Sequence, residues 1–143
     1  MLISIIEIAP VFPAYQRIWQ LRNDILRKPL GLILSKEEVL NEADQIHLAA
    51  FDGEAFLGCV LLTPLKQEIK LRQMAVSESF RGRGIGRQLL LAAENLARKR
   101  GYKRISCHAR ETAMEFYQAN GWAVEGKGFI EVTIPHVAMS KTL

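Results

Sequence analysis

The sequence predicts an α+β domain of three layers, in which helices flank a mixed central sheet. Short β-branched runs separated by turn signals between residues 46 and 76 are typical of an antiparallel meander. A strand–helix–strand–helix–strand order follows from residue 69 to the C-terminus, and it favours helices packed on a sheet. The chain has 143 residues, 49% hydrophobic and 24% charged, so we expect a single globular domain over residues 1–143.

The first forty residues contain one expected strand and two expected helices. Ile3–Ile8 is apolar and β-branched and is followed by prolines, which predicts a strand. Apolar residues at helical spacing predict a helix that begins after Pro13 and ends at Arg27. Ser35, followed three residues later by Glu38, is a capping-box signature and predicts a second, short helix.

Three strands of a meander come next. Ile46–Phe51 and Ala55–Leu62 flank the turn signal Asp52-Gly53 and predict a hairpin. Ile69–Val76 then continues the alternation as a third strand.

The second half of the chain changes to helical periodicity. Gly84–Arg100 is a long amphipathic segment, and Gly101 follows it where a left-handed C-terminal cap belongs. Lys103–His108 predicts a strand, Thr112–Asn120 a short helix, and Trp122–Thr142 two further strands.

The net excess of positive charge lies in one segment. Residues 81–110 contain nine Lys and Arg against one Asp or Glu, whereas the segments before and after each carry a net charge of −2. Such a cluster indicates an anionic partner, although a solvated helix face is the alternative.

Membranes, metals and disulfides are not expected. The apolar stretches are too short to span a bilayer and no signal-peptide pattern is present, so we expect a soluble, cytoplasmic protein. The histidines and cysteines lack zinc-ligand spacing, so we expect no metal. Cys59 and Cys107 are expected to be small core residues rather than nucleophiles, and His47 a structural histidine.

A glycine-rich loop lies inside the basic segment, directly before the long helix. Its sequence is Arg81-Gly82-Arg83-Gly84-Ile85-Gly86-Arg87. Glycines let the backbone approach a ligand closely, and a helix N-terminus presents free N–H groups and a positive dipole end that favour phosphate. The spacing matches neither G-x-G-x-x-G nor the P-loop pattern, but it does match R-x-x-G-x-G.

This loop and its context resemble the GNAT superfamily of N-acetyltransferases, which has the acyl-CoA N-acyltransferase fold. The shared order is a strand ending Met74-Ala75-Val76, the glycine loop, the long helix, a strand, and a short helix with Phe116-Tyr117 that stops at Gly121-Trp122. Leu21-Arg22 followed by Pro29-Leu30-Gly31, and Ile134-Pro135-His136 with Met139, are similar to a subgroup of small stand-alone bacterial acetyltransferases.

The resemblance implies binding of acetyl-CoA as co-substrate and direct transfer of its acetyl group to an amine of a small molecule or a protein. It implies that the strand before the loop diverges from its neighbour and exposes backbone groups to the pantetheine arm. The residues it assigns to the cofactor are Met74, Ala75, Val76, Arg81, Gly82, Arg83, Gly84, Ile85, Gly86 and Arg87. Many relatives carry an asparagine where this chain has Arg110, so that role is not transferred.

Acetyl transfer needs a polarised carbonyl, a neutral amine and a proton for the leaving thiolate. A bulge in the strand Gln73–Val76 would free a backbone N–H for the carbonyl. Tyr117 is the candidate proton donor, because a phenol of pKa about 10 is protonated at neutral pH; the alternative is a core tyrosine.

The general base and the acceptor site stay open at this stage. The candidates for the base are Glu42, His108, Glu111 and His136, with Gln73 as a residue that could position a water and an ordered water chain as the alternative. Arg22, Gln73 and His136 are candidates for contact with the acceptor.

Two other functions compete with catalysis. One is a non-catalytic CoA sensor of the same fold, and the other is a nucleic-acid-binding module that uses the basic segment. Because the arginines surround a glycine cradle, we expect no nucleic-acid partner. A homodimer formed through the C-terminal strands is a further expectation from the resemblance.

Overall fold

The computed structural model describes residues 2–143, which form a seven-stranded mixed sheet with helices on its faces. The strand order is β1-β2-β3-β4-β5-β7-β6, and every neighbouring pair is antiparallel except β4–β5. The strands are β1 (Ser4–Glu7), β2 (Ile46–Asp52), β3 (Ala55–Pro64), β4 (Ile69–Val76), β5 (Arg104–Arg110), β6 (Ala123–Glu131) and β7 (Ile134–Thr142). This architecture confirms the predicted mixed sheet flanked by helices.

The helical elements separate into an N-terminal group and a group after β4. The first group is α1 (Gln16–Arg22), a π-helical turn η1 (Asn23–Arg27), a 3-10 turn η2 (Lys28–Leu30) and α2 (Lys36–Leu40). The second is a 3-10 turn η3 (Glu78–Phe80), α3 (Ile85–Lys99), a 3-10 turn η4 (Glu111–Ala113) and α4 (Met114–Ala119).

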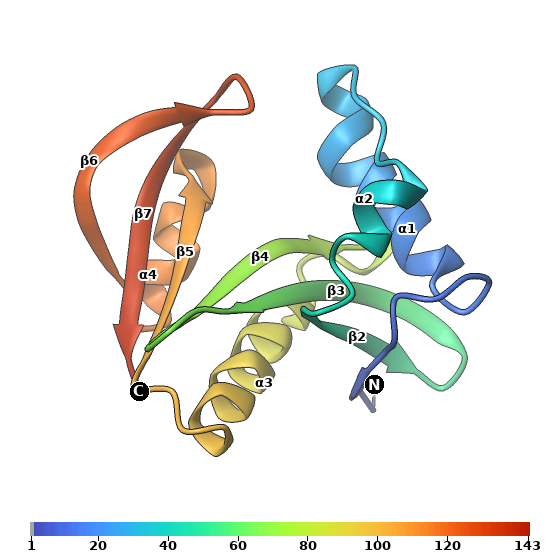
Figure 1. Ribbon diagram of the computed structural model, residues 1–143, viewed down its shortest axis with the longest axis horizontal. Helices are drawn as coiled ribbons and strands as arrows, with labels where there is room; N and C mark the ends of the chain where they lie inside the picture. The colour runs from blue at the N-terminus through green and yellow to red at the C-terminus, as the bar shows by residue number, and fades with distance from the viewer. Residues whose placement is uncertain (1) are drawn as a thin grey trace.

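The helices α1 and α3 lie on opposite faces of the β2–β3–β4 half of the sheet, whereas η4 and α4 pack on the β5–β7–β6 half (Figure 1). The helix α3 buries Leu89, Leu90 and Ala93 in the larger core cluster, against strands β2 to β5. The helix α1 buries Ile18 in a second cluster, together with Cys59 of β3. Cys59 and Cys107 are both buried and form no disulfide bond, as predicted.

Local capping signals set several helix ends. The Ser35 hydroxyl accepts a hydrogen bond of 3.1 Å from the Glu38 N–H, which confirms the predicted capping box. Gly84 and Gly101 flank α3 with φ angles of +78° and +85°, a left-handed conformation that glycine adopts without strain.

Two sequence expectations need correction. The helix expected to continue to Arg27 is α-helical only to Arg22, after which the chain forms a π-helical turn and a 3-10 turn. The short helix expected from Thr112 begins with the 3-10 turn η4, so that its α-helical part starts at Met114.

No helix within residues 2–143 is long and apolar enough to cross a membrane.

Candidate active site

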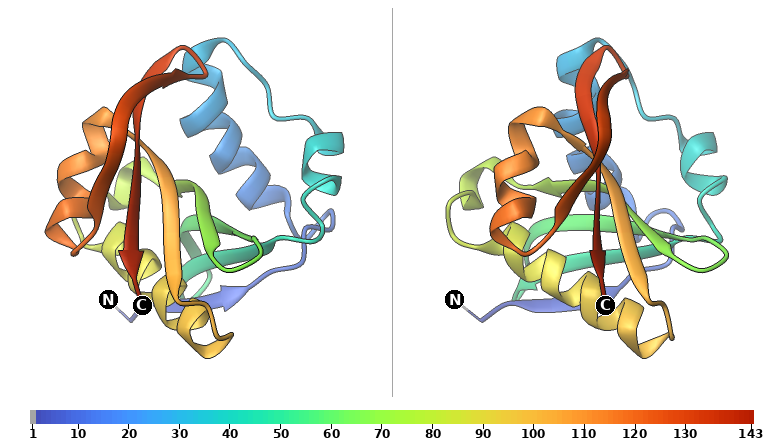
Figure 2. Two further views of the ribbon diagram at one scale, coloured as in Figure 1. Left: turned by 60° about the vertical axis from the view of Figure 1, so that its left-hand side comes forward. Right: turned by 90° about the vertical axis from the view of Figure 1, so that its left-hand side faces the viewer.

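The strands β4 and β5 separate partway along their length. They pair in parallel only where Ile69–Leu71 face Ile105–Cys107. Beyond that point β4 pairs only with β3, and β5 only with β7. Each strand therefore presents backbone N–H and C=O groups to the space between them, and Figures 1 and 2 show the two halves of the sheet parting there. This geometry agrees with the divergence that the resemblance implied.

A β-bulge occurs in β4 where it leaves β5. Cys59 of β3 pairs with Ala75, but Leu61 pairs with Arg72, so a single β3 residue faces both Gln73 and Met74. Gln73 has a φ of +55°, a rare conformation for a residue with a side chain. The bulge turns the Met74 side chain toward the larger core cluster and Ala75 toward the smaller one.

The glycine loop follows β4 and opens α3. Gly82 and Gly84 have φ angles of +75° and +78°, and no heavy atom lies within 4 Å of the point where a Cβ would be. The backbone is therefore open to an approaching group, and the first N–H groups of α3 point out of the helix end beside it. The residues present fit a phosphate cradle.

The side chains around this loop divide into exposed and packed ones. Arg81, Arg83 and Arg87 are exposed; Arg81 Nε donates a 3.5 Å hydrogen bond to the Val76 carbonyl oxygen, and the Arg83 guanidinium lies over the Phe80 ring. Ile85 is buried in the core, so its contribution to a ligand can come only from its main chain. Gly86 is packed rather than open, because a Cβ there would lie 3.6 Å from Phe116 and 3.8 Å from the sulfur of Met74. Gly86 thus brings α3, β4 and α4 into contact.

Tyr117 lies beside the end of the β4–β5 pairing. Its ring packs edge-on against Phe116 at 5.1 Å and tilted against Trp122 at 5.2 Å. Its hydroxyl neighbours Cys107, the last β5 residue paired with β4. Burial raises the pKa of the Tyr117 phenol, and the Cys107 thiol adds to the shift. The phenol is therefore protonated at neutral pH, as a proton donor must be.

Burial also raises the pKa of the Cys107 thiol to about 12, despite the opposing effects of Tyr117 and Lys70. This thiol is neutral at physiological pH and is not an activated nucleophile.

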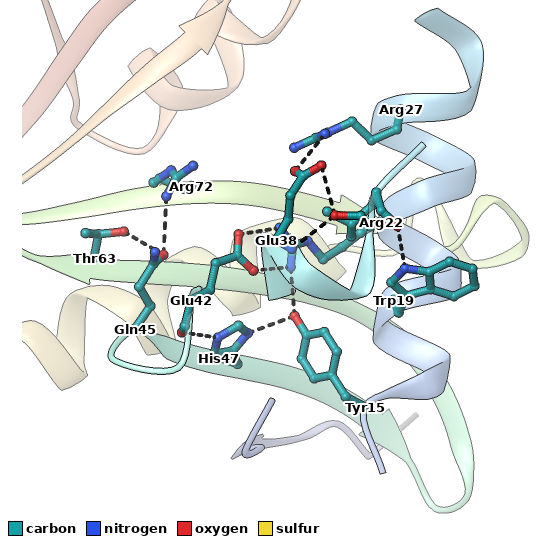
Figure 3. Close-up of polar contacts among 12 residues, drawn as sticks. Tyr15, Trp19, Arg22, Arg27, Glu38, Glu42, Gln45, His47, Thr63 and Arg72 are labelled. Atoms are coloured by element: carbon teal, nitrogen blue, oxygen red, sulfur yellow. Dashed lines mark hydrogen bonds and ion pairs between the residues drawn. The ribbon is translucent and has the colours of Figure 1, made fainter. Parts of the chain in front are cut away.

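The assignment of Arg22 to the acceptor site is wrong, because its side chain has no surface exposed to solvent. Both terminal nitrogens donate to the Glu42 carboxylate, at 2.7 and 2.8 Å (Figure 3). The Tyr15 hydroxyl accepts a further bond from Arg22 and contacts His47 Nδ1 at 2.8 Å. The Glu42 carboxylate therefore forms a buried ion pair, and we no longer consider it a candidate for the general base.

His47 is structural, as predicted. Its two ring nitrogens contact the Tyr15 hydroxyl and the Glu42 carbonyl oxygen. Burial lowers the pKa of His47, and the nearby Arg22 adds to this, so the ring is neutral inside the network.

The other candidate acceptor and base residues are scattered around the diverging strands. Gln73 sits in the bulge of β4. His136 on β7 pairs with Arg110 and is buried, with its Nδ1 2.7 Å from the Ile134 carbonyl oxygen. Glu111 is exposed on η4.

His108, the remaining candidate base, is exposed on β5. Its Nδ1 lies 2.9 Å from the carboxylate of Glu131 and 3.4 Å from Lys70. Sequence reasoning did not single out Glu131 or Lys70. The signal that could have found them is strand pairing across β4, β5 and β6, which a single sequence does not reveal.

Among residues 2–143, no three His, Cys, Asp or Glu side chains are grouped so that they could hold a metal ion.

Comparison with known proteins agrees with this geometry. A family model described as an acetyltransferase (GNAT) domain matches residues 33–143. The uncharacterized N-acetyltransferase YjcF of Bacillus subtilis is 30% identical over 106 residues, which cover 73% of this chain and 74% of that protein. The uncharacterized protein YyaT of the same organism is 28% identical over 132 residues, covering 85% of this chain and 88% of YyaT.

Solved structures share the fold. An acyl-CoA N-acyltransferase from Pseudomonas aeruginosa superposes with a TM-score of 0.84 at 18% identity, covering 99% of this chain and 100% of that chain. The PaiA N-acetyltransferase from Thermoplasma acidophilum, solved in complex with coenzyme A, has a TM-score of 0.80 at 20% identity, with both chains fully covered. With the family match over most of its length, the chain belongs to the GNAT family of N-acetyltransferases.

Proposed function

We propose that this enzyme transfers the acetyl group of acetyl-CoA directly to an amine of a small molecule or a protein. The observation that carries the proposal is the divergence of β4 from β5 beside a glycine loop that opens α3. These two features supply an edge of unpaired backbone and an anion cradle at adjacent points of one chain segment.

The glycine loop supports binding of the CoA pyrophosphate. The open backbone at Gly82 and Gly84 lets phosphate oxygens reach the N–H groups at the start of α3. Arg81, Arg83 and Arg87 add positive charge on exposed side chains. In this proposal the loop backbone sets the position of the phosphates, and the arginines strengthen the attraction.

The β4 edge supports binding of the pantetheine arm. Met74, Ala75 and Val76 lie beyond the last residue of β4 that pairs with β5. On that side they pair with no other strand, so their main-chain groups there can hydrogen-bond an amide-containing chain as a further strand would, although the Val76 carbonyl oxygen also accepts a 3.5 Å bond from Arg81 Nε. The bulge at Gln73 offers a backbone N–H toward the thioester carbonyl, where negative charge develops during attack by the amine.

Tyr117 is proposed as the acid that protonates the leaving sulfur. Its raised pKa keeps the phenol neutral, and it lies beside Cys107, where β4 and β5 part. As the C–S bond breaks, this hydroxyl donates a hydrogen bond to the developing CoA thiolate and passes its proton to the sulfur, and the tyrosinate regains a proton from solvent.

The proposal is tested with a panel of amines that includes polyamines, aminoglycosides, free amino acids and short peptides. We expect release of free thiol from acetyl-CoA with at least one acceptor, and calorimetric binding of CoA in its absence. CoA binding without thiol release for any amine would contradict catalysis and leave the alternative of a CoA sensor. Salt-dependent binding to DNA without stabilisation by CoA would favour a nucleic-acid-binding module instead.

A further inference from the structure

A cluster of ionisable side chains lies where β4 and β5 part, on the sheet face opposite α3 and α4. His108 is the first β5 residue beyond the last β4–β5 pair, Leu71 with Cys107. Its Nδ1 contacts Oε1 of Glu131 on β6 at 2.9 Å and Nζ of Lys70 on β4 at 3.4 Å. Three strands therefore place one ionisable group each at this point.

The two contacts of His108 Nδ1 make opposite demands on its protonation. A carboxylate only accepts, so the Glu131 contact requires a hydrogen on Nδ1, whereas an ammonium only donates and requires a bare Nδ1. The contact with Glu131 is shorter by 0.5 Å, which favours the tautomer with Nδ1–H. In that neutral tautomer, Nε2 carries the lone pair.

The Nε2 atom of His108 is free to accept a proton. Within residues 2–143 it forms no hydrogen bond, and the His108 side chain is 36% exposed. The ring is nevertheless fixed in orientation, because Phe129 packs edge-on against it at 5.0 Å. An oriented imidazole with one bonded nitrogen and one open nitrogen is the arrangement of a general base.

Glu131 is held in its ionised form by its neighbours. Partial burial would raise the pKa of Glu131, but the hydrogen bond from His108 and the nearby positive charge of Lys70 oppose it, and the pKa is lowered. Nε2 of His136 lies 3.8 Å from the second carboxylate oxygen. An ionised carboxylate 2.9 Å from Nδ1 favours the tautomer of His108 with its hydrogen on Nδ1.

The position of His108 complements that of Tyr117. Successive residues of a strand point to opposite faces, so Cys107 faces Tyr117 while His108 faces the other side of the same strand. The β4 bulge at Gln73 is two residues beyond Leu71, or about 7 Å along the strand. A thioester held at the bulge would then have Tyr117 on one face and His108 on the other.

We propose that His108 Nε2 is the general base that removes a proton from the acceptor amine, with Glu131 as its positioning residue. This inference rests on the proposed acetyltransferase function. The amine nitrogen bonds to the thioester carbonyl carbon and its proton passes to Nε2; the C–S bond breaks and the sulfur takes a proton from Tyr117. The products are the amide and free CoA thiol, and the two side chains exchange protons with solvent to return to their initial states.

The first test is His108→Gln, assayed by thiol release with the best amine of the panel. The maximal kcat/KM should fall by about 10²–10⁴, the range for losing a positioned base. CoA affinity measured by calorimetry should not change, because His108 lies on the face away from the glycine loop. Ser106→Ala, two residues earlier on the same face of β5, is the matched control and should keep its activity.

The second test compares pH profiles and separates a base from a merely structural histidine. Loss of the carboxylate in Glu131→Gln makes the imidazolium less favourable, so the acid limb of kcat/KM should move to lower pH. Loss of the ammonium in Lys70→Met should move the same limb to higher pH. Arg110 shares this face of β5 and is left intact in both variants, so its charge cancels in the comparison. A limb set by the acceptor amine alone would not move in either variant.

The outcomes distinguish this inference from the proposed function. Turnover with an unchanged rate in His108→Gln, or with a limb that does not move, overturns the base while acetyl transfer stands. If no amine is acetylated, ¹⁵N NMR of the His108 ring still decides the tautomer. Protonation of Nδ1 in the neutral ring supports the inference, and protonation of Nε2 overturns it irrespective of activity.

Discussion

Substitution of Gly84 separates the cost of backbone strain from the loss of a phosphate site. Its φ is +78° and no heavy atom lies within 4 Å of a Cβ placed there, so a valine would meet no steric clash inside the free protein. The only cost to stability is the left-handed conformation, about 1–2 kcal/mol for a residue with a side chain. For a chain of this size that corresponds to a fall in Tm of about 2–8 °C.

The effect of Gly84→Val on CoA binding should be larger than its effect on stability. The side chain would occupy the open approach to the first N–H groups of α3, and each hydrogen bond to a charged phosphate contributes about 1.5–3 kcal/mol. Loss of two such bonds weakens binding by at least about 10²-fold. Calorimetry with CoA measures this directly, on protein shown to be folded by its melting curve.

Gly101 is the matched control for this substitution. It follows the other end of α3 with a φ of +85° and the same open space around a Cβ. Gly101→Val should therefore lower Tm to a similar degree and leave CoA affinity unchanged. A folded Gly84→Val variant that binds CoA like the wild type would refute the cradle, and equal losses of affinity in both variants would show that strain alone is responsible.

Three further predictions follow from the same structure. Tyr117→Phe should leave CoA affinity nearly intact and lower kcat by about 10²–10⁴, whereas a core tyrosine would show a lower Tm with unchanged turnover of the folded fraction. Arg22→Met should reduce the free energy of unfolding by about 3–5 kcal/mol in urea, because it leaves the Glu42 carboxylate buried alone, and the double variant with Glu42→Leu should recover much of that loss. Hydrogen bonds from Arg104 and Ser140 lower the pKa of Glu125 from 4.5 to about 2, so the contribution of Glu125 to folding stability is present above pH 4.5 and is lost as the pH falls toward 2. Glu125→Gln should therefore reduce the dependence of Tm on pH between these values, and an unchanged dependence would contradict the assignment.

Features set by neighbouring residues could be predicted from the sequence. The strand predicted over Ile69–Val76 has the same limits as β4. The helix cap at Ser35 and the left-handed conformation of Gly101 could be predicted from only a few residues on either side. The glycine loop was also recognisable, because its open backbone depends only on local conformation and on the start of one helix.

Features set by contacts between distant segments could not be predicted in this way. The bulge at Gln73 depends on the register between β3 and β4, and nothing in its own sequence marks it. Likewise, the pairing of His108 with Glu131 depends on β7 lying between β5 and β6, and on an irregularity of β6 between Glu125 and Phe129. A single sequence carries no information on such registers.

The wrong assignment of Arg22 to the acceptor site has a different cause, because the helical periodicity of the sequence already predicts that Arg22 is buried. Ile18, Leu21 and Ile25 recur at helical spacing, and Arg22 lies four residues after Ile18 on the same face. An arginine on the apolar face of a helix needs a carboxylate inside the protein, and Glu42 provides it. The ion pair ties the end of α1 to the turn that enters β2, whereas the residues left for chemistry lie around β4 and β5.

The placement of those residues follows from one property of β5. Alternate side chains of a strand point to opposite faces, so Cys107 and His108 face Tyr117 and Glu131 respectively, at the point where β4 has just parted from β5. In the proposed transfer, the proton given by Tyr117 and the proton taken by His108 would therefore move on opposite sides of the strand. A one-residue shift in the β4–β5 register would exchange the two faces, which makes the short parallel pairing of Ile69–Leu71 with Ile105–Cys107 a determinant of the proposed chemistry.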